Sequence, residues 1–239
     1  MKVTYKTPAG AIHKVYDTMA HDIHLLIAGC SGSGKSCVIN GIMSTLLYSS
    51  PHKVRFILID PKKVELSDYA GLPHTIQYAD SADMVDALHN ACDIMMQRYD
   101  AMKAQGVKMY PGADIYVIID EFAQLVLKHK DASEYIQQLA QLGRAAKIHV
   151  IAATQCPTAA VISTPIKVNF DSRIALHVRS RQDSRNIMDI SGAESLPEHG
   201  KAYYVTAGGY KIINLPYVQE PEYKRLIDHW MDDRNTIVH

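Results

Sequence analysis

Apolar runs of strand length alternate with stretches of helical period along this 239-residue chain. Short apolar runs separated by amphipathic helices are typical of βαβ crossovers, which build a mainly parallel sheet. The pattern predicts strands over residues 24–28, 54–59, 115–119, 148–153 and 173–178. It also predicts helices over residues 36–48, 81–103, 131–142, 180–190 and 221–233, and a hairpin of residues 202–205 and 210–215 that turns at Gly208 and Gly209. An α/β protein follows, with a central sheet, helices on both of its faces and a C-terminal β-hairpin.

The helix boundaries are predicted from polar residues that can act as caps. Asp80 or Ser81 precedes the helix 81–103, and Asp131, with Glu134 three residues on, precedes the helix 131–142. The stretches 104–112 and 158–165 show no period and are predicted as mobile loops. A chain of this length suits one large α/β domain over residues 1–239, with a core of about 22–216 and a closing helix of about 221–233.

Composition and charge restrict the function classes. Lys and Arg total 25 and Asp and Glu also total 25, so any contact with nucleic acid must be local. No apolar run approaches the roughly 18 to 20 residues that span a bilayer, and residues 1–10 lack the layout of a secretory signal. We therefore expect a cytoplasmic setting, or a soluble domain of a membrane-tethered protein, with no membrane contact by this chain. The four cysteines lack zinc-ligand spacing and are expected to be reduced thiols.

A glycine-rich segment between the first strand and the first helix carries the clearest chemical signal. Residues 29–36 fit the pattern G-x-x-x-x-G-K-[ST] of a phosphate-binding loop, or Walker A motif. Glycines let backbone N–H groups approach phosphate, and the following helix presents its positive end to the same anion. The pattern predicts ATP as the ligand, with Lys35 on the β- and γ-phosphates and Ser36 on Mg²⁺. The expected nucleotide-binding residues are Gly29, Cys30, Ser31, Gly32, Ser33, Gly34, Lys35, Ser36 and Cys37.

Two further predicted strands end in polar residues that are expected to act together with the phosphate-binding loop. Asp120 and Glu121 follow a buried strand, as in a Walker B motif, so Asp120 is predicted to hold Mg²⁺ and Glu121 to polarise the attacking water. An acidic strand end alone is also common at protein surfaces. The next strand ends near Gln155, whose neutral amide is predicted to sense the γ-phosphate or the water; a polar strand end with no role is the alternative.

Ring-shaped ATPases of this type use an arginine from a neighbouring subunit to stabilise charge on the phosphates. The candidate arginine fingers are Arg144, Arg173 and Arg185, with Arg179 and Arg181 as further possibilities. Each one alone could equally be a surface or salt-bridged residue. Together they suggest a subunit interface.

Six short strings spread over residues 22–205 extend the match beyond the Walker motifs. They are 24–29, 59–62 with 65–66, 118–123, 139–146 with 148–149, 153–155, and 183–185 before 192–194. In this order they resemble the motor domain of the FtsK/SpoIIIE family of DNA translocases. The resemblance implies a RecA-like fold, a homo-oligomeric ring that is hexameric, and double-stranded DNA gripped by its phosphate backbone. Asp60, Lys62 and Glu65 lie in a family signature for which the residues themselves suggest no role.

Several positions depart from the family pattern, and two other functions stay open. Cys30 replaces a common threonine, Cys156 a common arginine, and Lys201 a common acid. These departures leave Lys35, Ser36, Asp120 and Glu121 in place, so they bear on rate and subunit coupling. The alternatives to DNA translocation are a related ATPase that powers protein secretion, as in type VII systems, and a nucleotide-gated assembly module with little turnover.

Overall fold

The computed structural model describes Tyr16, Met19 and residues 22–236. Its strands are β1 (His24–Ala28), β2 (Val54–Ile59), β3 (Thr75–Ala79), β4 (Asp114–Ile119), β5 (Ile148–Thr154), β6 (Ser172–Ala175), β7 (Lys201–Thr206) and β8 (Gly209–Asn214). Its helices are α2 (Lys35–Leu46), α3 (Met84–Gln105), α4 (Phe122–Lys128), α5 (Lys130–Leu142), α6 (Thr164–Asn169), α7 (Arg181–Met188) and α8 (Glu220–Thr236), with short 3₁₀ turns η1 (Ser67–Tyr69) and η2 (Ala193–Ser195).

Within the described residues, eight strands form one sheet in the order β3-β2-β4-β5-β1-β6-β7-β8. Neighbouring strands from β3 to β6 pair in parallel, whereas β7 pairs antiparallel with both β6 and β8. The predicted α/β class, the mainly parallel sheet and the C-terminal hairpin are therefore confirmed. Because β5 lies between β1 and β4, and the three strands are parallel, the loops that follow their carboxyl ends lie next to one another on one side of the sheet.

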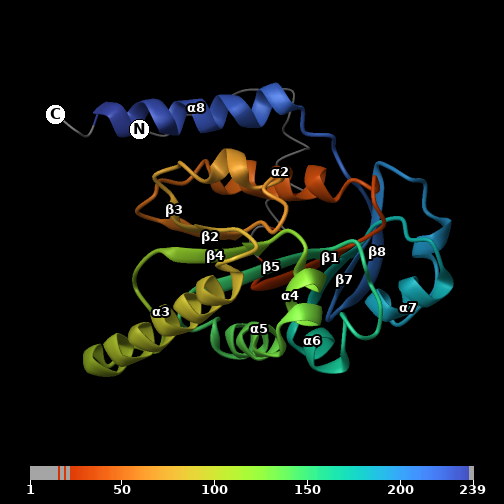
Figure 1. Cartoon of the computed structure of the whole chain (residues 1–239), viewed down its shortest axis with the longest axis horizontal. Helices are drawn as coiled ribbons and strands as arrows, with labels where there is room; N and C mark the ends of the chain where they lie inside the picture. Colours follow the sequence, from red (N-terminus) through yellow and green to blue (C-terminus); the bar gives the residue numbers. More distant parts are fainter. Residues whose placement is uncertain (1–15, 17–18, 20–21, 237–239) are drawn as a thin grey trace.

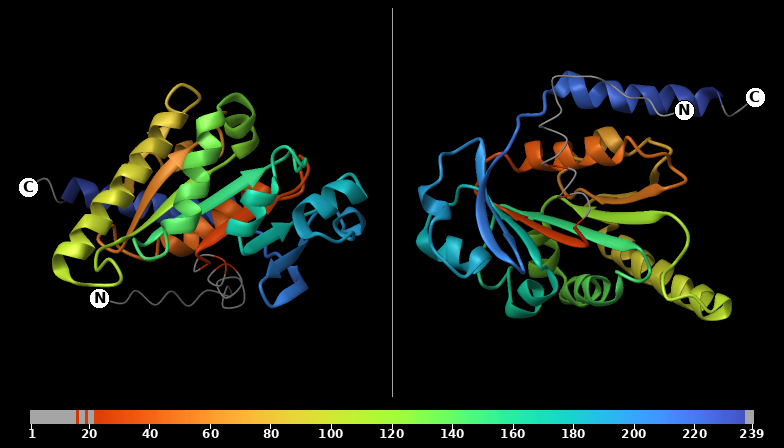
Figure 2. Two further views of the ribbon diagram at one scale, coloured as in Figure 1. Left: turned by 90° about the horizontal axis from the view of Figure 1, so that it is seen from below. Right: turned by 180° about the vertical axis from the view of Figure 1, so that it is seen from behind.

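Helices cover both faces of the sheet, as Figures 1 and 2 show. Along β1 the side chains alternate, so that Leu26 belongs to the core cluster that includes residues of α3, α4 and α5, while Leu25 belongs to the cluster that includes residues of α2. The helix α8 lies over α2 on this second face, where Ile227 is buried and Trp230 donates a hydrogen bond from Nε1 to the carbonyl of Leu47 at 2.8 Å. The predicted closing helix is confirmed.

Three elements were not predicted from the sequence: β3, α4 and α6. The strand β3 lies at the edge of the sheet and is only partly buried, so its apolar signal is weak. The helix α4 has seven residues, too few to show a clear period. The helix α6 contains Pro165 in its first turn, a position that tolerates proline, so the prediction of a loop through residue 165 is wrong at its end.

Several predicted boundaries are also wrong by a few residues. The helix α3 begins at Met84 with Asp83 at its N-cap position and no side-chain cap hydrogen bond, whereas Asp80 accepts the N–H of Ala82 in a separate turn before it. The helix α5 begins one residue before Asp131, which therefore lies in its first turn and is not its cap. The strand β6 ends at Ala175 and not at residue 178. The hairpin closes over residues 207–208, because Thr206 pairs with Gly209, so the turn lies one residue earlier than predicted.

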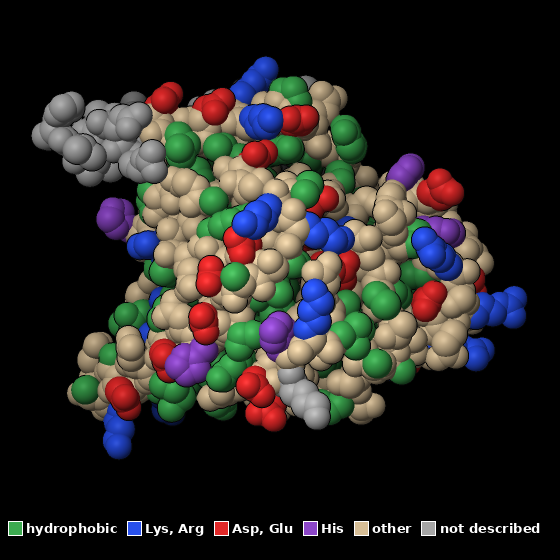
Figure 3. Space-filling view, in the orientation of Figure 1, with side chains coloured by type: hydrophobic (Ala, Val, Ile, Leu, Met, Phe, Trp, Pro, Cys, Tyr) green, Lys and Arg blue, Asp and Glu red, His purple; other side chains and the backbone are tan. Residues whose placement is uncertain are grey.

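The distribution of surface charge and the free cysteines agree with the predictions made from composition. On the face shown in Figure 3, acidic and basic side chains are interspersed and no single basic patch dominates. The four cysteines, Cys30, Cys37, Cys92 and Cys156, are all free. Among the described helices, none combines the length and apolar composition needed to cross a membrane.

A buried histidine at the start of β1 makes the fold sensitive to acid. His24 Nδ1 accepts the N–H of Val150 at 3.1 Å, its Nε2 has no partner, and burial lowers the pKa of its ring to about 3. The unfolded chain takes up a proton below about pH 6.5 while the folded chain does not, so acid favours unfolding. We expect the unfolding free energy to lose about 2 to 3 kcal/mol between pH 6.5 and 4.5 through His24.

Urea unfolding of wild type and His24→Asn at both pH values checks this prediction. Asn can accept the Val150 N–H through its side-chain oxygen, but it does not titrate. Between pH 6.5 and 4.5 the unfolding free energy of His24→Asn should therefore fall by about 2 to 3 kcal/mol less than that of wild type. Equal losses in the two proteins would assign the acid sensitivity to other groups.

Candidate functional site

The glycine-rich loop connects β1 to α2 and has the backbone of an anion cradle. Gly32 and Gly34 adopt φ angles of +80° and +97°, which residues with a side chain rarely adopt. At Gly29 an added Cβ would lie 2.5 Å from Ser33 Oγ, so the loop also needs glycine where it packs against itself. The helix α2 begins at Lys35, and the N–H groups of its first turn have no acceptor within the helix. These groups and the helix dipole favour a bound anion at the loop.

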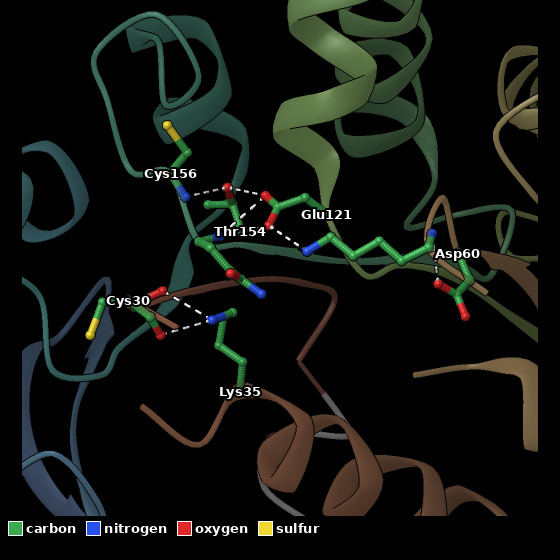
Figure 4. A network of polar contacts seen from close by, with 9 residues as sticks. Cys30, Lys35, Asp60, Glu121, Thr154 and Cys156 are labelled. Atoms are coloured by element: carbon green, nitrogen blue, oxygen red, sulfur yellow. Dashed lines mark hydrogen bonds and ion pairs between the residues drawn. The ribbon is translucent and has the colours of Figure 1, made fainter. Parts of the chain in front are cut away.

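Lys35 supplies a buried cation at this loop. Its side chain is buried, and Nζ donates hydrogen bonds to the carbonyl oxygens of Gly29 at 3.1 Å and Cys30 at 3.0 Å (Figure 4). Burial lowers the pKa of the Lys35 ammonium, and the nearby carboxylates of Glu121 and Asp120 oppose that shift. The loop lysine and the acidic pair predicted from the sequence therefore lie within electrostatic reach of each other.

Asp120 and Glu121 follow β4 and are both buried, with 5% of each residue exposed. Burial and, to a smaller extent, the charges of Glu65 and Asp60 together raise the pKa of Asp120 to about 6, and the charge of Lys62 opposes this shift. A carboxylate in such surroundings is stabilised by a cation placed beside it.

Thr154 links the acidic pair to the glycine-rich loop. Its hydroxyl donates to Glu121 Oε1 at 2.7 Å, and its carbonyl oxygen accepts the N–H of Gly29 at 3.3 Å. The backbone N–H of Gln155 also donates to both carboxylate oxygens of Glu121, at 3.1 Å each. Thr154, at the end of β5, thus contacts both halves of the predicted site, and its contact with Glu121 is drawn in Figure 4.

At the end of β5, the amide side chain of Gln155 is the group predicted from the sequence to sense the γ-phosphate or the attacking water. In the structure that side chain is exposed, and the contacts with Glu121 come from the Thr154 hydroxyl and the Gln155 backbone. The sensing role of the amide stays a prediction. The signal for Thr154 was a hydroxyl residue at the end of a buried strand, next to the predicted sensor.

The structure also gives the signature after β2 a place in the site. Asp60 is fully buried and accepts backbone N–H groups of Lys62 and Leu66, at 3.2 and 3.0 Å. Lys62 Nζ lies 3.8 Å from Glu121 Oε2. Sequence reasoning left these residues without a role, because their proximity to Glu121 depends on the pairing of β2 with β4.

The candidate arginines lie apart from this cluster. Arg144 is exposed in the turn before β5, at the opposite edge of the sheet from the loop after β5. Arg173 in β6 lies 3.6 Å from Asp189, and Arg181 lies 3.7 Å from Glu194. Among the described residues, none of the five candidates, Arg144, Arg173, Arg179, Arg181 and Arg185, contacts Lys35, Asp120 or Glu121. Their action in a neighbouring subunit stays a prediction.

The oxygen ligands at this site, from Ser36 and Asp120, suit Mg²⁺ that is bound together with a nucleotide. Within the described part of the chain, no three His, Cys, Asp or Glu side chains gather in a way that could hold a metal ion. Mg²⁺ in such sites takes one or two protein oxygens and completes its shell with water and substrate phosphates. Ser36, half-buried at the start of α2, and the buried carboxylate of Asp120 supply oxygens of this kind.

The chain is similar in sequence to DNA translocases. The FtsK/SpoIIIE family model matches residues 9–114 and 109–159. DNA translocase FtsK of Oceanobacillus iheyensis is 37% identical, over 89% of this chain and 30% of that protein. DNA translocase SpoIIIE of Bacillus subtilis is 36% identical, over 86% of this chain and 29% of that protein. The chain therefore spans less than a third of the length of these relatives.

Solved structures with the same fold include ATPases of different systems. The conjugation coupling protein TcpA of pCW3, in its monomer form with ATPγS, aligns with a TM-score of 0.77 and 22% identity over 88% of this chain and 66% of that chain. The cytoplasmic domain of the type VII secretion ATPase EccC of Thermomonospora curvata aligns with a TM-score of 0.76 and 21% identity, over 87% of this chain and 28% of that chain. At this identity the two structures support the fold alone.

Proposed function

The chain belongs to the FtsK/SpoIIIE family, and we propose that it is an ATP-hydrolysing motor domain that moves double-stranded DNA through a ring of identical subunits. The observation that carries the proposal is the convergence of the loop lysine and the acidic pair at one sheet edge, joined through Thr154. The proposal treats residues 1–239 as one ATPase domain with a core of about 22–216. It includes a cytoplasmic location, where ATP is supplied.

ATP binding is assigned to the glycine-rich loop and the first turn of α2. Backbone N–H groups from Gly29 to Cys37 would hold the phosphates, and Lys35, which here donates to the carbonyls of Gly29 and Cys30, would instead donate to the β- and γ-phosphates. This change replaces hydrogen bonds to neutral carbonyls with bonds to charged oxygens, which are stronger. Ser36 and Asp120 would hold Mg²⁺, which when bound offsets charge on the phosphates.

Hydrolysis is assigned to Glu121 as the group that orients and polarises water. Thr154 and the Gln155 N–H hold its carboxylate at the end of β4, so that a lone pair can accept a proton from a water beside the γ-phosphate. Gln155 is proposed to report the state of that phosphate through its exposed amide. Arg144, Arg173 and Arg185 are the arginine finger candidates; Arg173 is the least available of them because it pairs with Asp189.

The sequence comparison favours DNA over protein as the cargo. The relatives of 36 to 37% identity are named DNA translocases, whereas the secretion ATPase EccC is 21% identical and shares the fold alone. The balanced surface charge agrees with a grip on the phosphate backbone by a local channel surface rather than by a broad basic face. A hexamer is the ring size that the family resemblance implies.

Duplex DNA is expected to stimulate ATP hydrolysis. Linear duplex DNA should raise the rate severalfold, and rising salt should weaken the stimulation, because contacts with phosphate release counterions. The assay compares no addition, duplex DNA, heparin as a polyanion control, and a secretion signal peptide, on protein sized by light scattering. A rate that ignores DNA and rises with the peptide would reverse the cargo assignment. A nucleotide-dependent ring with negligible turnover would instead support the assembly module.

A further inference from the structure

The turn that follows β2 is built around one buried carboxylate. Asp60 has no exposed surface, and its two side-chain oxygens accept the backbone N–H groups of Lys62 at 3.2 Å and Leu66 at 3.0 Å. The hydroxyl of Tyr78, in β3, lies 3.5 Å from Asp60 Oδ2. The turn is therefore anchored at both of its ends, and the backbone of Lys62 is held in a defined position.

Two consecutive lysines leave this turn in different directions. Lys63 has a φ angle of +57°, in the left-handed region, and its Nζ pairs with Asp80 at 2.5 Å. Lys62 instead extends toward the end of β4, where its Nζ lies 3.8 Å from Glu121 Oε2. Lys62 is thus directed toward Glu121, whereas Lys63 is directed toward the surface.

Lys62 contacts the side of Glu121 that Thr154 leaves open. The Thr154 hydroxyl binds Oε1, the Gln155 N–H lies between the two oxygens, and Lys62 faces Oε2. Glutamate has a flexible side chain, so contacts from two sides restrict the carboxylate more than contacts from one side do. The side chain of Lys62 is 38% exposed and that of Glu121 only 7%, so the ammonium reaches into the site from solvent.

We propose that Lys62 is a positioning residue for Glu121, holding the carboxylate in place through an ion pair from the turn that follows β2. The inference rests on the proposed function, because Glu121 matters only if it activates water. A separation of 3.8 Å is an ion pair and not a hydrogen bond, so Lys62 leaves the lone pairs of Glu121 able to accept a proton. It also supplies positive charge among the carboxylates of Asp60, Glu65, Asp120 and Glu121.

Lys62→Gln is expected to reduce kcat for ATP by about 10- to 100-fold, the scale of a misplaced catalytic group, without a comparable change in KM. The affinity for ATPγS should stay at the wild-type value, because the proposal gives Lys62 no contact with phosphate. Lys62→Arg should recover most of the rate, since it keeps the charge. The melting temperature should change little, because the Lys62 ammonium is partly exposed to solvent and lies 3.8 Å from the carboxylate, so the pair contributes little to stability.

Lys63→Gln is the matched control, because it removes the adjacent lysine of the same turn, whose partner Asp80 lies outside the site. It should hydrolyse ATP like wild type. The inference is overturned if Lys62→Gln keeps the wild-type kcat, if its defect lies in ATPγS affinity, or if Lys62→Arg is as slow as Lys62→Gln. Wild-type protein that does not hydrolyse ATP under any condition would instead remove the proposed function. If Glu121→Gln is inactive while Lys62→Gln is not, only the inference about Lys62 fails.

Discussion

Glu121→Gln is expected to lower ATP turnover by about 10²- to 10⁴-fold, the usual contribution of a general base, while ATPγS binds as tightly as to wild type. Glutamine has the shape of glutamate, and its side-chain oxygen can still accept from Thr154 and from the Gln155 N–H. It has no carboxylate to accept a proton from water. Steady-state ATPase assays and ATPγS titrations of the two proteins measure the two quantities separately.

A glutamate outside the site provides the control for this substitution. Glu134 in α5 is exposed, so Glu134→Gln makes the same chemical change on the surface and should leave turnover unchanged. Turnover retained by Glu121→Gln would refute the assignment of the base. Loss of both turnover and ATPγS binding would point to a damaged site rather than to a missing base.

Lys35→Ala is expected to weaken ATPγS binding by at least about 100-fold, because charge-assisted hydrogen bonds contribute about 1.5 to 3 kcal/mol each and two phosphates lose their partner. The fold should survive the change. Burial lowers the pKa of the Lys35 ammonium, so the folded chain without nucleotide gains little from this charge. Isothermal titration with ATPγS gives the affinity, and a thermal melt without nucleotide gives the stability.

The two measurements on Lys35→Ala separate a binding defect from a folding defect. A normal melt with lost affinity supports the phosphate-binding role of Lys35. Unchanged affinity would contradict the assignment of the glycine-rich loop as the nucleotide site. A melt far below that of wild type would show that the carbonyls of Gly29 and Cys30 need the ammonium for the loop to fold.

The sequence by itself determined the positions of the elements whose residues are nearly all buried. The strands β1, β2 and β4 are short apolar runs buried on both faces, so their positions could be predicted to within one residue. The loop from Gly29 to Ser36 was equally clear, because glycine spacing and Lys35 reflect the local geometry that binds phosphate. Elements with mixed exposure, such as β3, and short helices, such as α4 and α6, gave no such pattern.

Only the tertiary structure decided how the site is held together. Asp120 and Glu121 could be placed at the sheet edge from the sequence, since parallel strands end together there. Contacts between separate loops could not be predicted in this way: Thr154 on Glu121, and Lys62 facing the same carboxylate, depend on the order β2-β4-β5-β1 and on a turn shaped by Asp60. Local sequence patterns reflect the forces along one segment, whereas the partners of a buried charge are chosen by the packing of segments that lie far apart in the chain.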